Sequence, residues 1–167
     1  MIESATGLVL RTRRLTETSL IVHWLTPNLG RLATVAKGAL RAKSPFRGKL
    51  DLFYLADFSF ARSRRSELHT LREVSIRETL PAIRRELGRV QQASYAAALV
   101  EQVTESETPL PEIFELMRGL LNTLAQATPQ SHLVFAFELK LLAELGLKPD
   151  LSKSHLTPGA REIMKML

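Results

Sequence analysis

Alternating apolar and polar positions run through the first eighty residues and predict β-strands. Short runs rich in β-forming side chains occupy residues 8–10, 20–25 and 31–38, and the TPNLG turn joins the second run to the third as a hairpin. Two more strands are predicted at residues 50–60, a longer aromatic run, and at residues 67–76, after the polar ARSRRS turn. Because these strands would leave exposed edges in an open sheet, we expect them to close into a small barrel.

The five-stranded Greek-key OB barrel is the common solution for strands of this kind, although an SH3-like barrel fits their spacing nearly as well. A small barrel needs large side chains inside it. Trp24, Phe58 and Phe60 are therefore expected to be core residues rather than platforms for base stacking. Phe53 falls on the opposite face of its predicted strand, where it either stacks on a ligand or packs against a second domain.

From Pro81 onward the apolar positions recur with the period of a helix. Amphipathic helices are predicted at residues 89–103 and 110–127, and a short last helix at residues 156–167. The segment 131–146 is apolar nearly all round, so it is expected to be the central, buried helix. The predicted buried stripes comprise Ala93, Ala96, Ala97, Val100 and Val103 in the first helix and Leu110, Ile113, Phe114, Met117, Leu120, Leu121 and Leu124 in the second.

Local signals mark two helix ends. Thr108 followed by Pro109 is typical of a helix start, and Gly146 with Pro149 just beyond is typical of a helix end.

The predicted strands and helices together indicate an α+β fold. An N-terminal five-stranded OB-fold barrel, residues 1–79, is followed by an all-helical domain, residues 80–167.

Charge separates the two predicted domains. The chain carries 23 Lys and Arg against 17 Asp and Glu, and the first eighty residues alone have a net charge of +7. The remainder of the chain is close to neutral. A basic half joined to a nearly neutral half indicates that the barrel meets a polyanion, with solvated surface charge as the plainer alternative.

The strongest local signal is the segment LRAKSPFRGK between the third and fourth predicted strands. It is basic with no acidic residue, Gly38 and Gly48 give it flexible ends, and Phe46 is either a stacking surface or a plug in the barrel end. These parts suit a sequence-tolerant clamp for a single strand. The candidate DNA-binding residues in and beside the segment are Arg31, Lys37, Arg41, Lys43, Ser44, Arg47 and Lys49.

Two smaller basic clusters extend the list of candidates. Arg64 and Arg65, with Arg62, lie in the turn between the fourth and fifth strands, which is expected to be near the other binding loops of an OB fold. An ordinary polar hairpin fits that turn almost as well. Arg13 shares a strand face with Arg11 and either binds phosphate or pairs with Glu17.

Several classes of site find no support in the sequence. The chain has no cysteine and its four histidines are scattered, so we expect no metal and no cofactor. No pair of carboxylates, nucleophile with a base, or glycine-rich phosphate loop has usable spacing, so we expect no enzyme. We also expect no membrane association, since no apolar stretch is long enough for a membrane span. A cytoplasmic location is expected because the N-terminal residues MIESATGLVLRTRR are unlike a secretory signal and the chain has no cysteine.

The order of these motifs resembles the RecO family of recombination mediators. The run AKGALRAKS is the most specific part, and SYAAALVEQVTE, PEIFELMRGLL and FELKLLAELGLKPDL are similar to the family's helical domain. The matching barrel positions are Gly7, Leu10, Arg13, Glu17, Thr26, Gly30, Val35, Ala36, Lys37, Gly38, Ala39, Arg41, Lys43, Ser44, Gly48 and Leu50.

The resemblance implies an OB-fold protein of the bacterial nucleoid that binds single- and double-stranded DNA and promotes strand annealing. It also implies RecR and single-strand-binding protein as partners in loading RecA. Lys37, Arg41, Lys43 and Arg47 are its DNA-contacting candidates. Many family members continue after the turn LGLKPDL with a cysteine-bearing zinc module, which we expect this chain to lack because it has no cysteine. Two alternatives remain open: a protein-interaction adaptor that uses the helices and the apolar edge from Met164 to Leu167, and an RNA-binding OB module.

Overall fold

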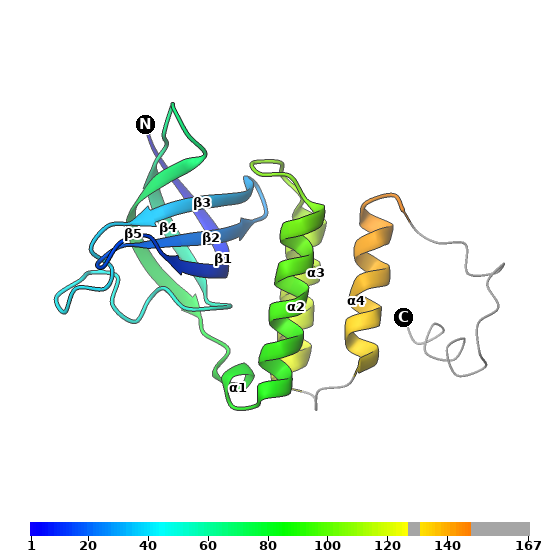
Figure 1. The fold of residues 1–167 in the computed structure, drawn as a ribbon. Coiled ribbons are helices and arrows are strands. Elements are labelled where there is room, and N and C mark those ends of the chain that lie inside the picture. The colour runs from blue at the N-terminus through cyan, green and yellow to red at the C-terminus, as the bar shows by residue number, and fades with distance from the viewer. Residues whose placement is uncertain (127–130, 148–167) are drawn as a thin grey trace, which may run out of the picture.

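The computed structural model describes residues 1–126 and 131–147 and contains a closed β-barrel followed by helices (Figure 1). The barrel order is β1-β2-β3-β5-β4, and β4 pairs with β1 to close it. The β3–β5 pair is parallel and the other pairs are antiparallel, which is the Greek-key order of an OB fold. The predicted barrel is therefore confirmed. Its strands are β1 (Ile2–Arg14), β2 (Leu20–Thr26), β3 (Gly30–Ala36), β4 (Leu55–Ala61) and β5 (Leu68–Glu78).

The long strand β1 lets the sheet close. Its first half pairs with β4 and its second half with β2, and the register shifts between Val9 and Arg11. Such a bulge bends a strand and increases its twist. Gly7 lies where β1 passes from pairing with β4 to pairing with β2. An added Cβ there would lie 2.9 Å from Cε1 of Phe58. The bend and the absent side chain together bring the two halves of the barrel close.

Aromatic side chains fill the barrel as predicted. Trp24 stacks on Phe58 with ring centroids 4.1 Å apart, and Phe60 is fully buried beside them. The indole Nε1 of Trp24 donates to Oγ1 of Thr34 at 2.9 Å, so the one polar atom of this core aromatic has a partner.

The predicted strand at residues 50–60 is wrong in its first half. β4 begins at Leu55, because Phe53 adopts a left-handed backbone with φ of 64° that breaks the alternation. The amide of Phe53 donates to the Val9 carbonyl at 2.8 Å, which fixes this turn against β1. The Phe53 side chain is buried in a core that it shares with the helices, which decides its role in favour of packing.

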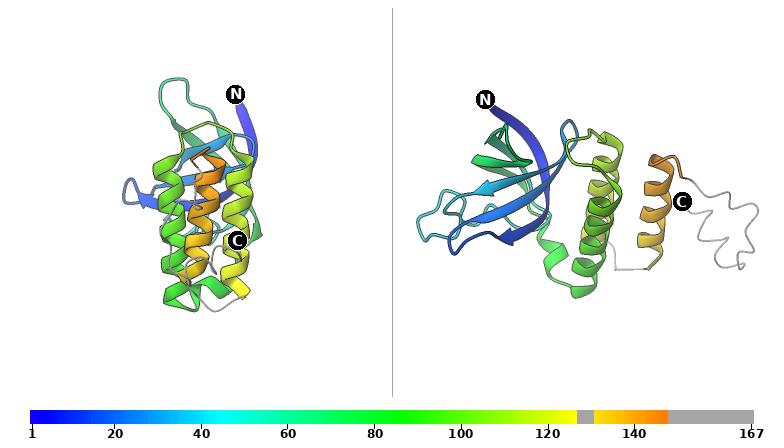
Figure 2. Two further views of the ribbon diagram at one scale, coloured as in Figure 1. Left: turned by 90° about the vertical axis from the view of Figure 1, so that its right-hand side faces the viewer. Right: turned by 45° about the horizontal axis from the view of Figure 1, so that its top comes forward.

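The helices are α1 (Pro81–Arg84), α2 (Leu87–Val103), α3 (Pro111–Gln126) and α4 (Ser131–Glu144). In Figures 1 and 2, α2 and α3 lie between the barrel and α4. One apolar core joins the barrel to the helices, since Leu8, Leu10 and Leu25 point out of the barrel into it. Its helical members are Ile83, Ala93, Ala96, Ala97, Val100, Ile113, Phe114, Met117, Leu120, Leu121, Leu124, Phe137 and Leu141.

Three helix predictions need correction. α4 is not central: it packs across α2 and α3 on the side away from the barrel, as Figure 2 shows. Val103 does not belong to the buried stripe but is 39% exposed at the end of α2. α3 begins at Pro111 instead of Thr108, because the chain first makes a turn at Glu107 with φ of 56°.

The predicted stop at Gly146 is confirmed. Gly146 has a φ of 73°, and the amide of Leu147 donates to the Leu142 carbonyl at 2.8 Å, as in a Schellman motif. The last predicted helix, residues 156–167, and its apolar edge lie outside the residues that the structure describes.

Candidate nucleic-acid interface

Residues 37–49, here called the basic segment, form a chain of tight turns after β3. Arg41 donates its amide to the Gly38 carbonyl at 3.1 Å, Ser44 to Arg41 at 3.1 Å, and Arg47 to Ser44 at 3.2 Å. Each bond links residues three apart, which is the spacing of a β-turn. Gly38 and Gly48 have φ values of 68° and 72°, so they supply left-handed turns that other residues adopt at a cost. The segment is thus defined by its own hydrogen bonds.

The barrel holds the basic segment in place. Phe46 is only 7% exposed and packs with Ala39 among the barrel's core residues. The amide of Leu40 donates to the Thr18 carbonyl at 2.9 Å, which ties the segment to the turn between β1 and β2. Phe46 is therefore a plug in the barrel end and not an exposed stacking surface.

The polar side chains of the segment face solvent. Oγ of Ser44 accepts the Phe46 amide at 3.2 Å, which leaves its hydroxyl proton available, and Nη1 of Arg47 donates to the Ala42 carbonyl at 3.0 Å. No carboxylate of residues 1–126 and 131–147 lies within 4.0 Å of the segment's cationic groups. The exposed residues are Lys37, Arg41, Lys43 and Arg47, and the half-buried ones are Ser44 and Lys49.

Arg13 lies beside the basic segment, and Arg31 does not. Arg13 is exposed and pairs with Ile21, which in turn pairs with Val35 near the end of β3. Arg31 is at the other end of β3, where its Nε donates to Oγ1 of Thr104 at 2.6 Å and its Nη2 to the Thr104 carbonyl. Burial lowers the pKa of Arg31. Its guanidinium therefore joins the barrel to α2.

The turn between β4 and β5 is also separated from the basic segment. Leu68, the first residue of β5, pairs in parallel with Ala33 at the middle of β3, so the turn before Leu68 lies toward the start of β3, whereas the basic segment follows the end of β3. Figure 1 shows the two loops at opposite ends of the barrel. Arg64 and Arg65 are exposed in this turn, but the structure does not bring them together with Arg41 and Arg47.

A hollow lined by charged side chains of both signs lies where the barrel meets α2 and the connection between α2 and α3. It has a volume of about 220 Å³, and its lining includes the carboxylates of Glu67, Glu101 and Glu107 and the guanidinium groups of Arg11 and Arg31. His23 also lines it, with a pKa lowered by burial and by the charge of Arg11, so the imidazole is neutral at pH 7. Arg11 is paired with Glu101 at 3.1 Å and Arg31 donates to Thr104, so both cations of this hollow already have partners within the protein.

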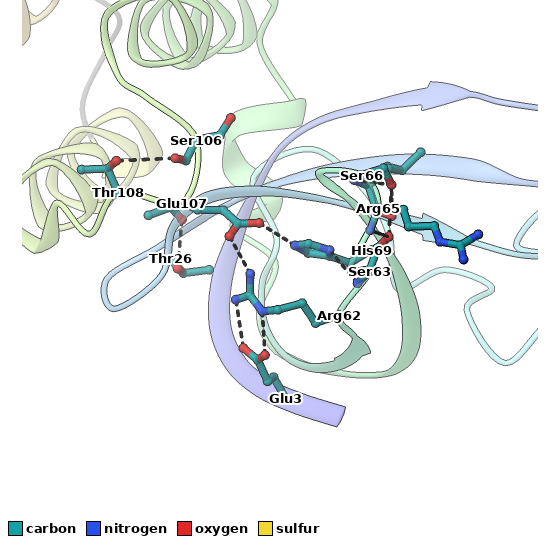
Figure 3. A network of polar contacts seen from close by, with 12 residues as sticks. Glu3, Thr26, Arg62, Ser63, Arg65, Ser66, His69, Ser106, Glu107 and Thr108 are labelled. Carbon is teal, nitrogen blue, oxygen red and sulfur yellow. Dashed lines mark hydrogen bonds and ion pairs between the residues drawn. The ribbon is translucent and has the colours of Figure 1, made fainter. Parts of the chain in front are cut away.

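A polar network beside this hollow has no counterpart in the sequence predictions (Figure 3). Arg62 donates to Glu3 from Nε at 2.6 Å and from Nη2 at 2.9 Å, and its Nη1 donates to Glu107 at 2.5 Å. The buried ring of His69 contacts the same Glu107 carboxylate at 2.7 Å, and its Nδ1 accepts the Ser63 amide at 3.2 Å. The ring therefore carries its proton on Nε2 and donates it to Glu107.

In this network the guanidinium of Arg62 is fully engaged with protein partners. The network joins the start of β1, the turn between β4 and β5, and the connection between α2 and α3. The carboxylates of Glu3 and Glu107 raise the pKa of Arg62 above its ordinary value, chiefly through the hydrogen bond to Glu3. Burial alone would raise the pKa of Glu107, but hydrogen bonds from His69 and Arg62 lower it overall. Arg62 thus ties the barrel to the connection between α2 and α3. No spacing in the sequence could have revealed this, because the partners are far apart along the chain.

Two site classes find no candidate in the described part of the chain. No group of three or more His, Cys, Asp or Glu side chains there could hold a metal ion. Within residues 1–126 and 131–147, no helix combines the length and apolar character that a membrane crossing needs.

Comparison with known proteins identifies the family. The profile of the recombination protein O N-terminal family matches residues 1–80, and that of the recombination protein O C-terminal family matches residues 84–158. Proteins called DNA repair protein RecO are similar along most of the chain. The one from Syntrophus aciditrophicus is 31% identical over 165 residues, covering 96% of this chain and 64% of its own length.

Two further relatives give the same picture. The protein of the same name from Anaeromyxobacter sp. strain K is 34% identical over 87% of this chain and 58% of its own length. The one from Bacillus subtilis is 32% identical over 91% of this chain and 59% of its own length. The chain spans less than two thirds of the length of these relatives. With both family profiles matched in order along a barrel and its helices, this chain belongs to the RecO family of DNA repair proteins.

Proposed function

We propose that the chain is a DNA-binding recombination mediator of the bacterial nucleoid. It binds single- and double-stranded DNA through the basic segment, promotes strand annealing and assists RecA loading together with RecR and single-strand-binding protein. Membership of the RecO family supports the repair role, since the relatives carry the name DNA repair protein.

One observation carries the DNA-binding part of the proposal. Four exposed cations, Lys37, Arg41, Lys43 and Arg47, are held on hydrogen-bonded turns with no acidic residue among them. Cations fixed in this way contact phosphates without first losing the freedom of a mobile loop. We include Arg13, Ser44 and Lys49 in the interface because they lie in or beside the segment. Arg31, Arg64 and Arg65 lie elsewhere on the barrel and are left out.

Fluorescence anisotropy with a labelled single-stranded oligonucleotide across a salt titration tests this proposal. Each phosphate contact contributes about −0.7 to the slope of log K against log salt for a single strand. The triple variant Arg41→Ala, Lys43→Ala, Arg47→Ala should therefore bind at least about tenfold more weakly at low salt, with a slope shallower by about 2.

A matched control separates the location of the charges from their number. The triple variant Arg64→Ala, Arg65→Ala, Arg85→Ala also removes three exposed cations, but outside the proposed interface. It should keep the slope of the natural protein. Equal losses in the two triple variants would mean that only net charge attracts the DNA, and the assignment to the basic segment would be wrong. Duplex and RNA probes of equal length complete the comparison, since phosphate contacts do not distinguish the polymers.

A protein-interaction adaptor is the second candidate, and apolar side chains on the helices favour it. Leu87 is 71% exposed and Phe135 is 54% exposed in the structure. A single exposed apolar residue is ordinary on a protein surface, so this candidate requires that such side chains belong to one contiguous apolar patch. A folded protein that binds no nucleic acid at low salt would leave this candidate in place of the mediator.

A further inference from the structure

A hollow in the middle of the basic segment combines an apolar floor with a cationic rim. It measures about 400 Å³, and its floor is formed by Leu20, Phe46 and Leu50 from the barrel end. Arg41 and Arg47 line the same hollow. An engineered apolar cavity of about 150 Å³ is enough to hold benzene, so a heterocyclic base fits within this volume.

Leu40 makes the hollow attractive to an apolar group. It lies within the basic segment, lines the hollow together with Arg41 and Arg47, and is 43% exposed. Covering an exposed leucine with a flat apolar surface is favourable, because it removes apolar area from water. A phosphate backbone alone would leave Leu40 in water.

The two arginines of the rim are held by the segment itself. The Arg41 side chain lies over Gly38, where an added Cβ would be 3.4 Å from Cδ of Arg41. Nη1 of Arg47 donates to the Ala42 carbonyl at 3.0 Å, which leaves its other N–H groups for a ligand. The lining therefore offers two cations beside an apolar floor.

We propose that this hollow takes one unpaired base of a single strand, while Arg41 and Arg47 hold the phosphates next to it. The inference rests on the proposed DNA-binding function and specifies how that site treats single strands. A nucleotide supplies both parts that the hollow matches, an apolar ring and flanking negative charge. A base inside a duplex is already stacked and paired, and its removal costs free energy, so the hollow favours single strands over duplex.

An abasic oligonucleotide tests the proposal because it has the same phosphates and no bases. The natural protein should bind a natural single strand about fivefold more tightly than an abasic strand of the same length, the lower end of the range for one stacked base. The variant Leu40→Ser should reduce the affinity for the natural strand to that for the abasic strand and leave the abasic affinity unchanged. The variant Leu87→Ser, at an exposed leucine on α2, is the matched control and should keep the difference.

Three results would overturn the inference. If both strands bind with equal affinity, the basic segment contacts phosphates alone. Equal affinity together with binding of a labelled acidic peptide, lost in Leu40→Ser, would assign the hollow to a protein partner. If neither strand binds, the proposed DNA-binding function fails together with the base-binding hollow. Equal binding of both strands, in contrast, overturns the hollow alone.

Discussion

At the scale of single residues, Glu107 combines a left-handed backbone with two side-chain hydrogen bonds in the barrel–helix contact. It adopts a left-handed φ of 56° and accepts hydrogen bonds from Arg62 and from the buried ring of His69. An ordinary surface ion pair contributes little to stability, but a buried donor without an acceptor costs about 1–3 kcal/mol. The position therefore matters chiefly through His69.

The first prediction concerns the variant Glu107→Ala, which removes the acceptor of the His69 proton. We expect its free energy of unfolding to fall by about 1–3 kcal/mol, measured by denaturant titration. The control is Arg77→Ala, which breaks the exposed ion pair to Asp57 and should cost less than about 1 kcal/mol. Equal small losses in both variants would show that His69 finds another partner.

The second prediction concerns His23, the residue whose Nε2 is buried without a partner in the described structure. Burial, together with Arg11, Arg13 and Arg31, lowers the pKa of His23 below 6.5, against the opposing effect of Glu101. The unfolded chain therefore binds a proton more readily than the folded one. Stability contributed by the neutral ring is present above pH 6.5 and is lost as the pH falls below it.

Unfolding at several pH values tests the role of His23. The free energy of unfolding of the natural protein should fall between pH 7 and pH 5.5, and the variant His23→Gln should show a shallower fall over the same interval. Carboxylates with lowered pKa values, such as Glu3 and Asp57, lose their contribution at lower pH, so they do not produce this difference. An identical fall in both proteins would contradict the assignment to His23.

At the scale of the elements, the turns of the basic segment depend on glycine. Gly38 has a φ of 68°, a backbone conformation that side-chain-bearing residues adopt at a cost, and an added Cβ would lie in van der Waals contact with the Arg41 side chain. The third prediction is that Gly38→Ala lowers the free energy of unfolding by about 1 kcal/mol and weakens DNA binding, because it distorts the turn that presents Arg41.

Gly119 is the matched control for Gly38. It lies within α3, is exposed, and an added Cβ would meet no atom within 4 Å. Alanine favours a helix over glycine, so Gly119→Ala should raise the free energy of unfolding by roughly 0.5–1 kcal/mol and leave DNA binding unchanged. If Gly38→Ala behaves like Gly119→Ala, the basic segment tolerates other turn geometries.

Sequence periodicity predicted most helices and strands correctly, but not the start of β4 or the position of α4 among the other elements. The strand containing Val22 and Trp24 and the stripe of α3 follow from local alternation, because neighbours along the chain decide which face is apolar. The start of β4 escaped prediction because Phe53 leaves the strand conformation for a turn fixed by Val9 of β1. The position of α4 escaped it because an apolar pattern reports that a helix is covered and not by which neighbour.

The candidate interface divides in the same way. The cations of the basic segment could be found from the sequence, since they lie within a few residues of one another along one loop. The involvement of Arg31 and Arg62 in barrel–helix contacts could not, because Thr104 and Glu107 are remote in sequence. Phe46 fits either role by composition, and only its burial shows that it is a plug.

At the scale of the whole molecule, barrel and helices behave as one folding unit. They share an apolar core that includes Leu10 of β1 and Phe114 of α3. The connection between α2 and α3 adds a backbone hydrogen bond from Glu107 to the Arg31 carbonyl at 2.7 Å. The helices therefore hold the barrel through side chains and backbone alike, and we expect a single cooperative unfolding transition.

Gly30 of β3 lies directly against the backbone of the connection between α2 and α3. It has a φ of 66°, and an added Cβ would lie 2.1 Å from the carbonyl oxygen of Thr108, a backbone atom that cannot turn aside. The fourth prediction is that Gly30→Ala displaces the connection between α2 and α3 from β3. Thermal unfolding should then occur at a lower temperature and over a broader range, and the amide of Glu107 should exchange its hydrogen faster than in the natural protein.

DNA binding below the transition should persist, because the basic segment follows the other end of β3. Unchanged exchange at Glu107 would mean that the backbone at Thr108 adapts locally and that the shared apolar core alone holds the two parts together.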